Sequence, residues 1–448
     1  MASTFRFVVP AVALVAAWGA ASAHAQQHDT GDAFAPRATL DLAAMMHLVA
    51  RRSPALSSDL LAVDLAAAET RQAHLLGNPT VDATWGTIPL GETNPAGLSA
   101  FSAVPYYAIG ASYTFPLGKR GPRQARAAAL QQSTRATLTA TARAVTLDLV
   151  RTLGDAAVST LRIDGLRGLV SQEKGSIALA QSRLTGGFGT PLEVDRLEIE
   201  LGRTEQQLLA NEAEMREALA TCATALGLRC DPFVASEDAR AFLIAWIDRA
   251  QAASAPIEER PDIRSLEAGE RAARAEADYA RAQALPDPTV RLGYTYDQFV
   301  VSGNQRHSLN LSVSLPIPLF DYGQAQRDAA EARRARLAAQ RERVITVAGV
   351  RTTALRAALE SREKRREVIA KQMLPRARVV VSDLEKAAST RLIPLTDVIQ
   401  ARRTLSELLV QEAESHGEAF RIAIDLVAES SAGAPDVHDR GTPQEAPR

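Results

Sequence analysis

The sequence is poor in cysteine, in aromatic residues and in net charge. Only Cys222 and Cys230 stand among its 448 residues, and aromatic side chains make up 5%. With 51 basic and 52 acidic residues, the chain lacks the basic excess of most nucleic-acid-binding proteins, so we expect no nucleic-acid partner. It also lacks G-x-S-x-G, H-E-x-x-H and P-loop motifs, and its histidines are scattered. We therefore expect no enzyme, no cofactor and no metal site.

Long apolar runs are confined to the N-terminus. Arg6 precedes an apolar run from Phe7 to about Ala20, and residues 23–25 (AHA) have the small-residue pattern of a cleavage site. Residues 1–25 are therefore predicted to be a secretory signal peptide, because the run is shorter than a membrane anchor needs. Beyond residue 25 no stretch of about 18 apolar residues follows, which predicts a soluble exported protein or a membrane protein built from strands.

The two cysteines lie on either side of a predicted helix end. Leu226-Gly227 separates Cys222 from Cys230, and glycine is the commonest residue just beyond a helix C-terminus. An exported protein meets an oxidising compartment in which disulfides form. The sequence leaves open both a disulfide and two buried thiols.

Similar segments recur at an offset of about 200 residues, as expected of an internal repeat. Each copy reads as helix, strand, strand, helix, helix, and the two copies cover residues 26–230 and 258–429. Residues 231–257 are expected to link them, and residues 430–448 to form a disordered tail. The strands are predicted at about residues 79–88, 106–115, 288–299 and 307–315.

The predicted strands alternate apolar and polar residues. In the last one, Leu309, Leu311 and Val313 alternate with small polar residues. This is the pattern of a transmembrane barrel strand, although a soluble sheet with one face on a core also alternates. Four strands cannot close a membrane barrel, and an open edge is not tolerated in lipid. Membrane strands would therefore have to be pooled, eight from two copies or twelve from three.

The remaining segments predict unusually long helices. Residues 123–184 contain no proline, and residues 324–372 are rich in Ala, Glu, Lys, Leu and Arg. A narrow apolar stripe, with Val398, Ala401 and Leu405 as examples, is typical of coiled-coil seams. A soluble periplasmic coiled-coil scaffold stays an alternative on the helices alone.

Together these segments resemble the TolC-like outer-membrane efflux protein family over about residues 40–428. Residues 115–121 (FPLGKRG) and 315–321 (LPIPLFD) are similar to two segments of its heavy-metal, CzcC-type branch. The resemblance implies a mainly helical fold with a small β part. It implies a homotrimer with a shared 12-stranded transmembrane β-barrel and a periplasmic helical tunnel, in the outer membrane of a Gram-negative bacterium. The implied partners are outer-membrane lipid, a periplasmic adaptor and an inner-membrane RND-type transporter.

The resemblance also assigns roles near the helix ends. The turns at Gly186, Gly187, Gly189, Arg391 and Leu392 would form the periplasmic tip, where the adaptor docks. Asp397 matches the first acidic residue of the family's entrance motif, Gln400 replaces the second, and Asp195 is the nearest acid of the first repeat.

A ring of Asp397 side chains would favour cations, but Asp397 can also be a solvated residue in a helix first turn. The resemblance favours heavy-metal cations as cargo. Drugs, other organic compounds and secreted polypeptides (type I secretion) remain alternatives.

Overall fold

The computed structural model of the protein describes residues 33–37, 41–86, 96, 106–253, 256–297, 305–389, 393 and 395–430. The expected signal peptide and residues 431–448 of the expected tail lie outside this part. Helices make up most of it. Their bounds are α1 Leu42–Arg52, α2 Ser57–His74, α3 Arg120–Thr185, α4 Pro191–Leu226, α5 Ser236–Ala252, α6 Pro261–Gln283, α7 Gln324–Val368, α8 Leu374–Ser389 and α9 Leu395–Glu429.

Short irregular turns connect some of these helices. A π-helical turn, Ile369–Met373, joins α7 to α8, and 3-10 turns occupy Pro54–Leu56 and Ile257–Glu259. Of the helices in the described part of the chain, none combines the length and the apolar content of a membrane-spanning segment.

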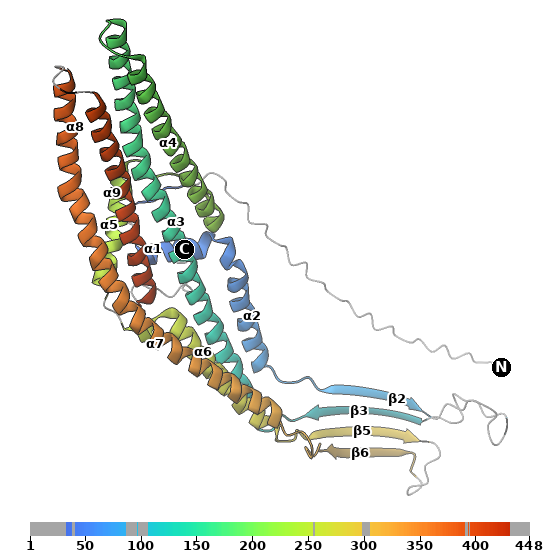
Figure 1. The fold of residues 1–448 in the computed structure, drawn as a ribbon. Coiled ribbons are helices and arrows are strands. Elements are labelled where there is room, and N and C mark those ends of the chain that lie inside the picture. Colours follow the sequence, from blue (N-terminus) through green and yellow to red (C-terminus); the bar gives the residue numbers. More distant parts are fainter. Residues whose placement is uncertain are drawn as a thin grey trace, which may run out of the picture. The chain divides into compact units, whose positions relative to one another are not determined.

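Four strands form an antiparallel sheet in the order β2-β3-β5-β6 (Figure 1). They are β2 Thr80–Gly86, β3 Tyr106–Thr114, β5 Thr289–Asp297 and β6 His307–Ser314. Each lies within the range that the alternation of the sequence predicts. The order helix, strand, strand, helix, helix occurs twice along the chain if α7 and α8, which the π-helical turn joins, are counted as one helix. The internal duplication stays a prediction. A separate parallel pair joins β1 (Ala33–Phe34) to β4 (Arg229–Cys230).

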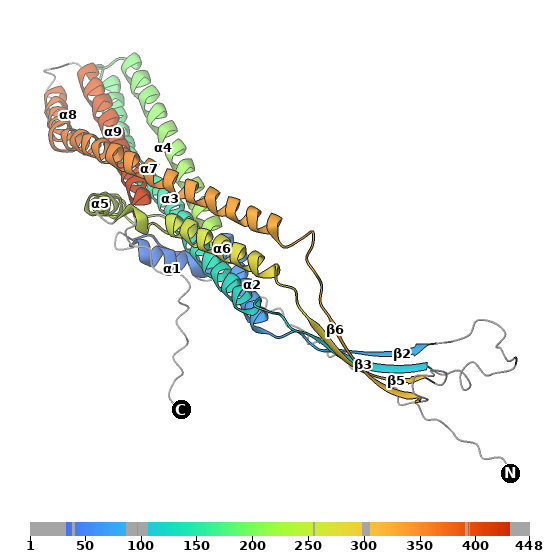
Figure 2. The ribbon, with the colours of Figure 1, turned by 90° about the horizontal axis from the view of Figure 1, so that it is seen from below.

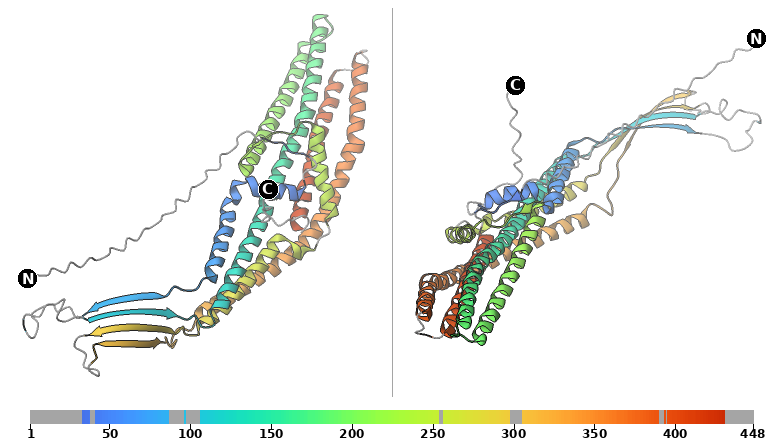
Figure 3. Two further views of the ribbon diagram at one scale, coloured as in Figure 1. Left: turned by 180° about the vertical axis from the view of Figure 1, so that it is seen from behind. Right: turned by 90° about the horizontal axis from the view of Figure 1, so that it is seen from above.

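Helix α3 organises the helical part. Its 66 residues correspond to about 100 Å of helix at 1.5 Å per residue. It contacts α4, α6 and α9 along its length, and the views of Figure 3 show α3 and α4 side by side. Helices α6 and α7 form a second contacting pair, visible in Figure 2.

The turn between α3 and α4 is specified locally. Gly187 has φ +78°, a left-handed conformation that glycine adopts without strain. Thr190 and Glu193 then form a reciprocal capping box, with Pro191 in the first turn of α4. These signals explain why the long helical run breaks at this point.

The main core lies where α1, α3, α5 and α9 meet. Phe242 and Trp246 of α5 are buried there, and the Phe242 ring centre lies 6.0 Å from that of Phe420 on α9. Helix α5 belongs to residues 231–257, which were expected to link two repeats. Its burial shows that this segment also contributes side chains to the core.

One disulfide bond and one buried arginine connect elements around this core. Cys222 of α4 is bonded to Cys230 of β4, which selects the disulfide from the two alternatives that the sequence left open. Arg143 of α3 donates to the carbonyls of Val427 (2.7 Å) and Ala428 (3.1 Å) at the end of α9. The last carbonyls of a helix have no partner within it, so Arg143 completes α9, and burial lowers the pKa of its guanidinium to about 10.

Candidate functional site: the exposed sheet and the helix ends

One face of the four-stranded sheet is apolar from edge to edge. The strand register places like residues in rows that cross all four strands. One row is Ala83, Ile109, Tyr294 and Leu309; the next is Val81, Ala111, Leu292 and Leu311.

A third row is aromatic and closes one end of this face. It contains Trp85, Tyr107, Tyr296 and His307. Tyr107 stacks at 6.2 Å on both Trp85 and Tyr296. Aromatic rows of this kind are typical of membrane–water interfaces.

The apolar face is open. Val81 and Leu309 are each 73% exposed and Leu311 is 71% exposed, so no element of the described chain covers them. A soluble sheet would bury these side chains against a core. The alternative of a sheet covered within its own chain is therefore wrong for the described residues.

The opposite face is polar and connected by hydrogen bonds between strands. Hydroxyl groups pair at 2.6 Å between Thr80 and Ser112 and at 2.8 Å between Thr114 and Thr289. An ion pair joins Asp82 of β2 to Arg291 of β5. The two faces thus differ in the way that lipid and water require.

The two outer strands are β2 and β6, and each has a partner on one side only in the described chain. Because neighbouring strands alternate in direction, β6 of one copy would meet β2 of another in an antiparallel arrangement. The sheet can therefore be extended by identical copies without changing its pattern.

The predicted entrance residues lie near the starts of helices α4 and α9. Asp397 is in the first turn of α9 and is exposed, and Asp195 is exposed near the start of α4. Gln400 is exposed and borders, with Ile399, a shallow cavity against Arg196 and Ile199 of α4. The structure thus brings Gln400 close to α4.

The predicted docking turns are described in part. Gly186, Gly187 and Gly189 form the turn between α3 and α4. Arg391 and Leu392 lie outside the described residues, between the end of α8 and the start of α9.

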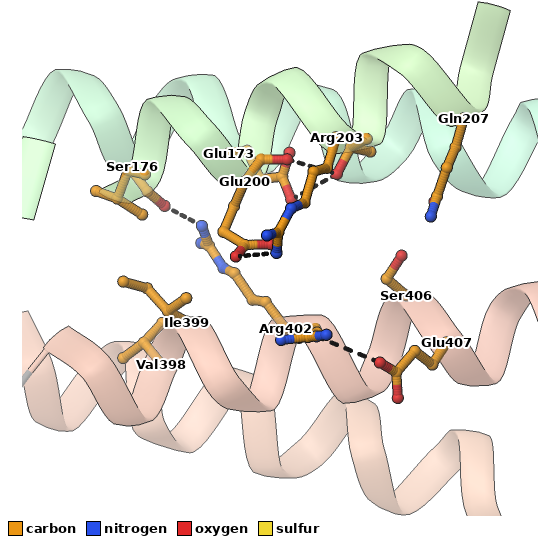
Figure 4. Close-up of a pocket in the computed structure, with 13 residues that line it drawn as sticks. Glu173, Ser176, Glu200, Arg203, Gln207, Val398, Ile399, Arg402, Ser406 and Glu407 are labelled. Carbon is orange, nitrogen blue, oxygen red and sulfur yellow. Dashed lines mark hydrogen bonds and ion pairs between the residues drawn. The ribbon is translucent and has the colours of Figure 1, made fainter. Parts of the chain in front are cut away.

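Arg402 of α9 ties three helices together close to the entrance residues. Its Nε donates to Glu385 of α8 at 2.9 Å, and its Nη1 donates to the Gln172 carbonyl of α3 at 3.1 Å. Figure 4 shows the same guanidinium directed at the hydroxyl of Ser176. Only 13% of the Arg402 side chain is exposed, so this charge depends on its partners.

A cavity of about 130 Å³ lies beside Arg402, between α3, α4 and α9 (Figure 4). Glu173 lines it and accepts a hydrogen bond from Thr204 at 3.0 Å. Burial raises the pKa of Glu173 above its usual value. Val398 and Ile399 close the cavity on the α9 side.

In the described part of the chain, no cluster of three or more His, Cys, Asp or Glu side chains has an arrangement that could hold a metal ion.

Sequence reasoning missed the ion pair of the polar face and the Arg402 tie. The alternation of the sequence places Asp82 and Arg291 on the polar faces of their strands, but their pairing depends on β3 lying between β2 and β5. Arg402 carries no local motif at all. The sequence offered a signal only for the ion pair, because Asp82 and Arg291 are opposite charges on strand faces that the alternation predicts to be polar.

Comparison with known proteins supports the fold. Residues 253–428 match the family model of the outer membrane efflux protein. No curated protein sequence matches the chain.

Solved structures match over most of the length. CusC is 16% identical with a TM-score of 0.67, covering 90% of this chain and 99% of its own. VceC of Vibrio cholerae is 16% identical with a TM-score of 0.66, covering 88% and 97%. The MtrE outer membrane channel of Neisseria gonorrhoeae is 13% identical with a TM-score of 0.64, covering 87% and 88%.

These likenesses show that the described chain has the fold of outer-membrane channel proteins. The family match lies in the second half of the chain, and the fold is shared along most of its length.

Proposed function

We propose that the chain is one subunit of an outer-membrane export channel, a passive conduit from the periplasm to the exterior. The observation that carries the proposal is the sheet, whose apolar face is open and whose two outer strands each have an unpaired edge in the described chain. In lipid, such edges leave backbone groups without partners, so copies must join them. Three copies would supply twelve strands, above the minimum of about eight for a membrane barrel.

The long helices then form the periplasmic tunnel. Many of their buried contacts are made by alanine and other small residues, which suits a thin wall of closely packed helices. The turn at Gly186, Gly187 and Gly189 faces the adaptor, and an RND-type transporter supplies the energy, because a conduit has no energy source of its own. The first turn of α9, with Asp397, lies at the entrance.

Heavy-metal cations are the proposed cargo, supported by the segments at residues 115–121 and 315–321. Deleting the gene should reduce tolerance to zinc, cobalt, cadmium, copper or nickel. Unchanged tolerance to all five, together with increased sensitivity to dyes and antibiotics, would favour organic compounds instead.

Membrane placement is tested by a matched pair of substitutions on β6. Leu311 lies on the apolar face and Ser312 on the polar face, and both are exposed in the single chain. Leu311→Lys should prevent assembly, because lysine facing lipid costs about 2–4 kcal/mol per copy near the midplane. Ser312→Lys should assemble like the unaltered protein.

The readout is detergent extraction of the outer-membrane fraction, followed by native mass determination. A heat-sensitive trimer that Leu311→Lys abolishes and Ser312→Lys preserves is the expected result. A soluble monomer that tolerates both substitutions would establish the periplasmic scaffold instead.

A further inference from the structure

An ion pair crosses an entire strand on the polar face of the sheet. Asp82 belongs to β2 and Arg291 to β5, and β3 lies between them (Figure 1). The Arg291 Nε donates to Asp82 Oδ1 at 3.2 Å, and its Nη2 donates to the second carboxylate oxygen. Two-point contact between a guanidinium and a carboxylate is both strong and directional.

Gly110 makes this crossing possible. It lies on β3 directly opposite Asp82 and Gly293. A Cβ at this position would lie 2.8 Å from Arg291 Nη2 and 2.9 Å from its Nε, which is too close. The arginine side chain therefore runs over the bare backbone of β3, and a larger residue at position 110 would displace the guanidinium from this path.

The surrounding polar face carries little other charge. Among the described strand residues of this face, the charged side chains are those of Asp82, Arg291 and Asp297, and Asp297 lies at the far end of β5. The remaining positions are mostly serine, threonine, asparagine and glycine. The two side chains of the pair are each about 40% exposed, at 42% for Arg291 and 43% for Asp82, so they face solvent.

We propose that the pairing of Asp82 with Arg291 keeps the sheet portion of the pore weakly selective between cations and anions. Each neutralises the other, which gives this stretch a weak charge through which cargo of either sign can pass. The inference rests on the proposed function, because the polar face borders water inside a pore only if copies close the sheet. It differs from a gate at Asp397, which would act at the opposite end of the channel.

The test is the reversal potential of single channels in a planar bilayer under a KCl gradient. Arg291→Gln leaves an unpaired carboxylate in every copy and should raise the K⁺/Cl⁻ permeability ratio. Three such charges about 10 Å from the pore axis would raise K⁺ about twofold and lower Cl⁻ about twofold at about 0.1 M salt, so the ratio should change about fourfold. Asp82→Asn should change the ratio by a similar factor in the opposite direction.

Two further variants serve as controls. The double variant Asp82→Asn/Arg291→Gln should return the ratio to that of the unaltered channel, because no unpaired charge remains. Ser112→Ala removes a neutral hydrogen bond of the same face and should leave the ratio unchanged. The single-variant effects should disappear at about 1 M salt, where screening limits a charge to about 3 Å.

Assembly is checked separately, by the heat-sensitive trimer. If a single variant does not assemble, the charge is introduced afterwards, using Arg291→Cys in the Asp82→Asn background. A cationic thiol reagent should then lower the K⁺/Cl⁻ ratio, and an anionic one should raise it.

The results distinguish a failure of the channel proposal from a failure of the selectivity proposal. Absence of any conductance from the purified unaltered protein would overturn the channel itself. A conducting channel whose ratio is the same in both single variants, or shifts in the same direction in both, would overturn the selectivity role and leave the pair as a tie between strands.

Discussion

The packing of α3 against α9 can be tested at Gly154. A Cβ at this position would overlap the ring of Phe420, and even the Cδ1 atom would be only 2.7 Å away. Phe420 is 1% exposed and packs at 6.0 Å against Phe242, so its ring has little room to move. Gly154→Ala is therefore expected to disturb the centre of the core.

Gly168 of the same helix is the matched control, because nothing lies within 4 Å of a Cβ there. Replacing a helical glycine by alanine normally stabilises a helix by about 0.8–1 kcal/mol. Gly168→Ala should show this gain. At Gly154 the same gain is offset by an overpacking cost of about 1–3 kcal/mol. The two variants should therefore differ by about 1–3 kcal/mol, with Gly154→Ala the less stable.

Denaturant unfolding in detergent, followed by tryptophan fluorescence, measures the difference. Trp246 is a suitable probe because its ring lies 6.4 Å from that of Phe242. A Trp85→Phe background removes the sheet tryptophan from the signal. Equal midpoints for the two variants, with unchanged slopes, would refute the close contact between α3 and α9 at this position.

Three further predictions concern other parts of the chain. Replacing Cys222 and Cys230 by serine should lower the free energy of unfolding by about 2–3 kcal/mol, because the unfolded chain is no longer constrained by a closed short loop. Chemical denaturation of the unaltered protein with and without reductant measures the same loss. Equal denaturation midpoints in the two conditions would argue against the bond. Burial alone would raise the pKa of Glu412, but hydrogen bonds from His416 and Arg240 outweigh it and lower the pKa to about 2. A carboxyl with a depressed folded-state pKa stabilises the fold above about pH 4.5, and the resulting ~3 kcal/mol of unfolding free energy should be lost as the pH falls toward 2. A Glu412→Gln variant should lose this part of the pH dependence. An unchanged dependence of the unfolding free energy on pH would contradict the prediction. Asp397→Ala should lower cation preference in bilayer conductance, and an unaltered preference would leave Asp397 as a solvated residue of a helix first turn.

Local sequence patterns determined the elements of this protein. Alternation located the four strands, because a strand with one face in a different solvent must change polarity at every residue. Glycine and proline located the turn between α3 and α4, because Gly187 adopts a left-handed conformation and Pro191 is tolerated at a helix start. The sequence also identified which residues of each strand share a face, although not which strands are neighbours.

Only the tertiary structure decided how distant segments combine. Placing β3 beside β5 brings Asp82 and Arg291 to the two sides of Gly110, and no short-range pattern encodes that pairing. Residues 231–257 were expected to act as a linker, but the bulky side chains of α5 fill the core beside Phe420. Arg402 joins α3, α8 and α9 without a motif. These contacts depend on packing between segments far apart in the chain, where shape and burial, rather than local propensity, select the partner.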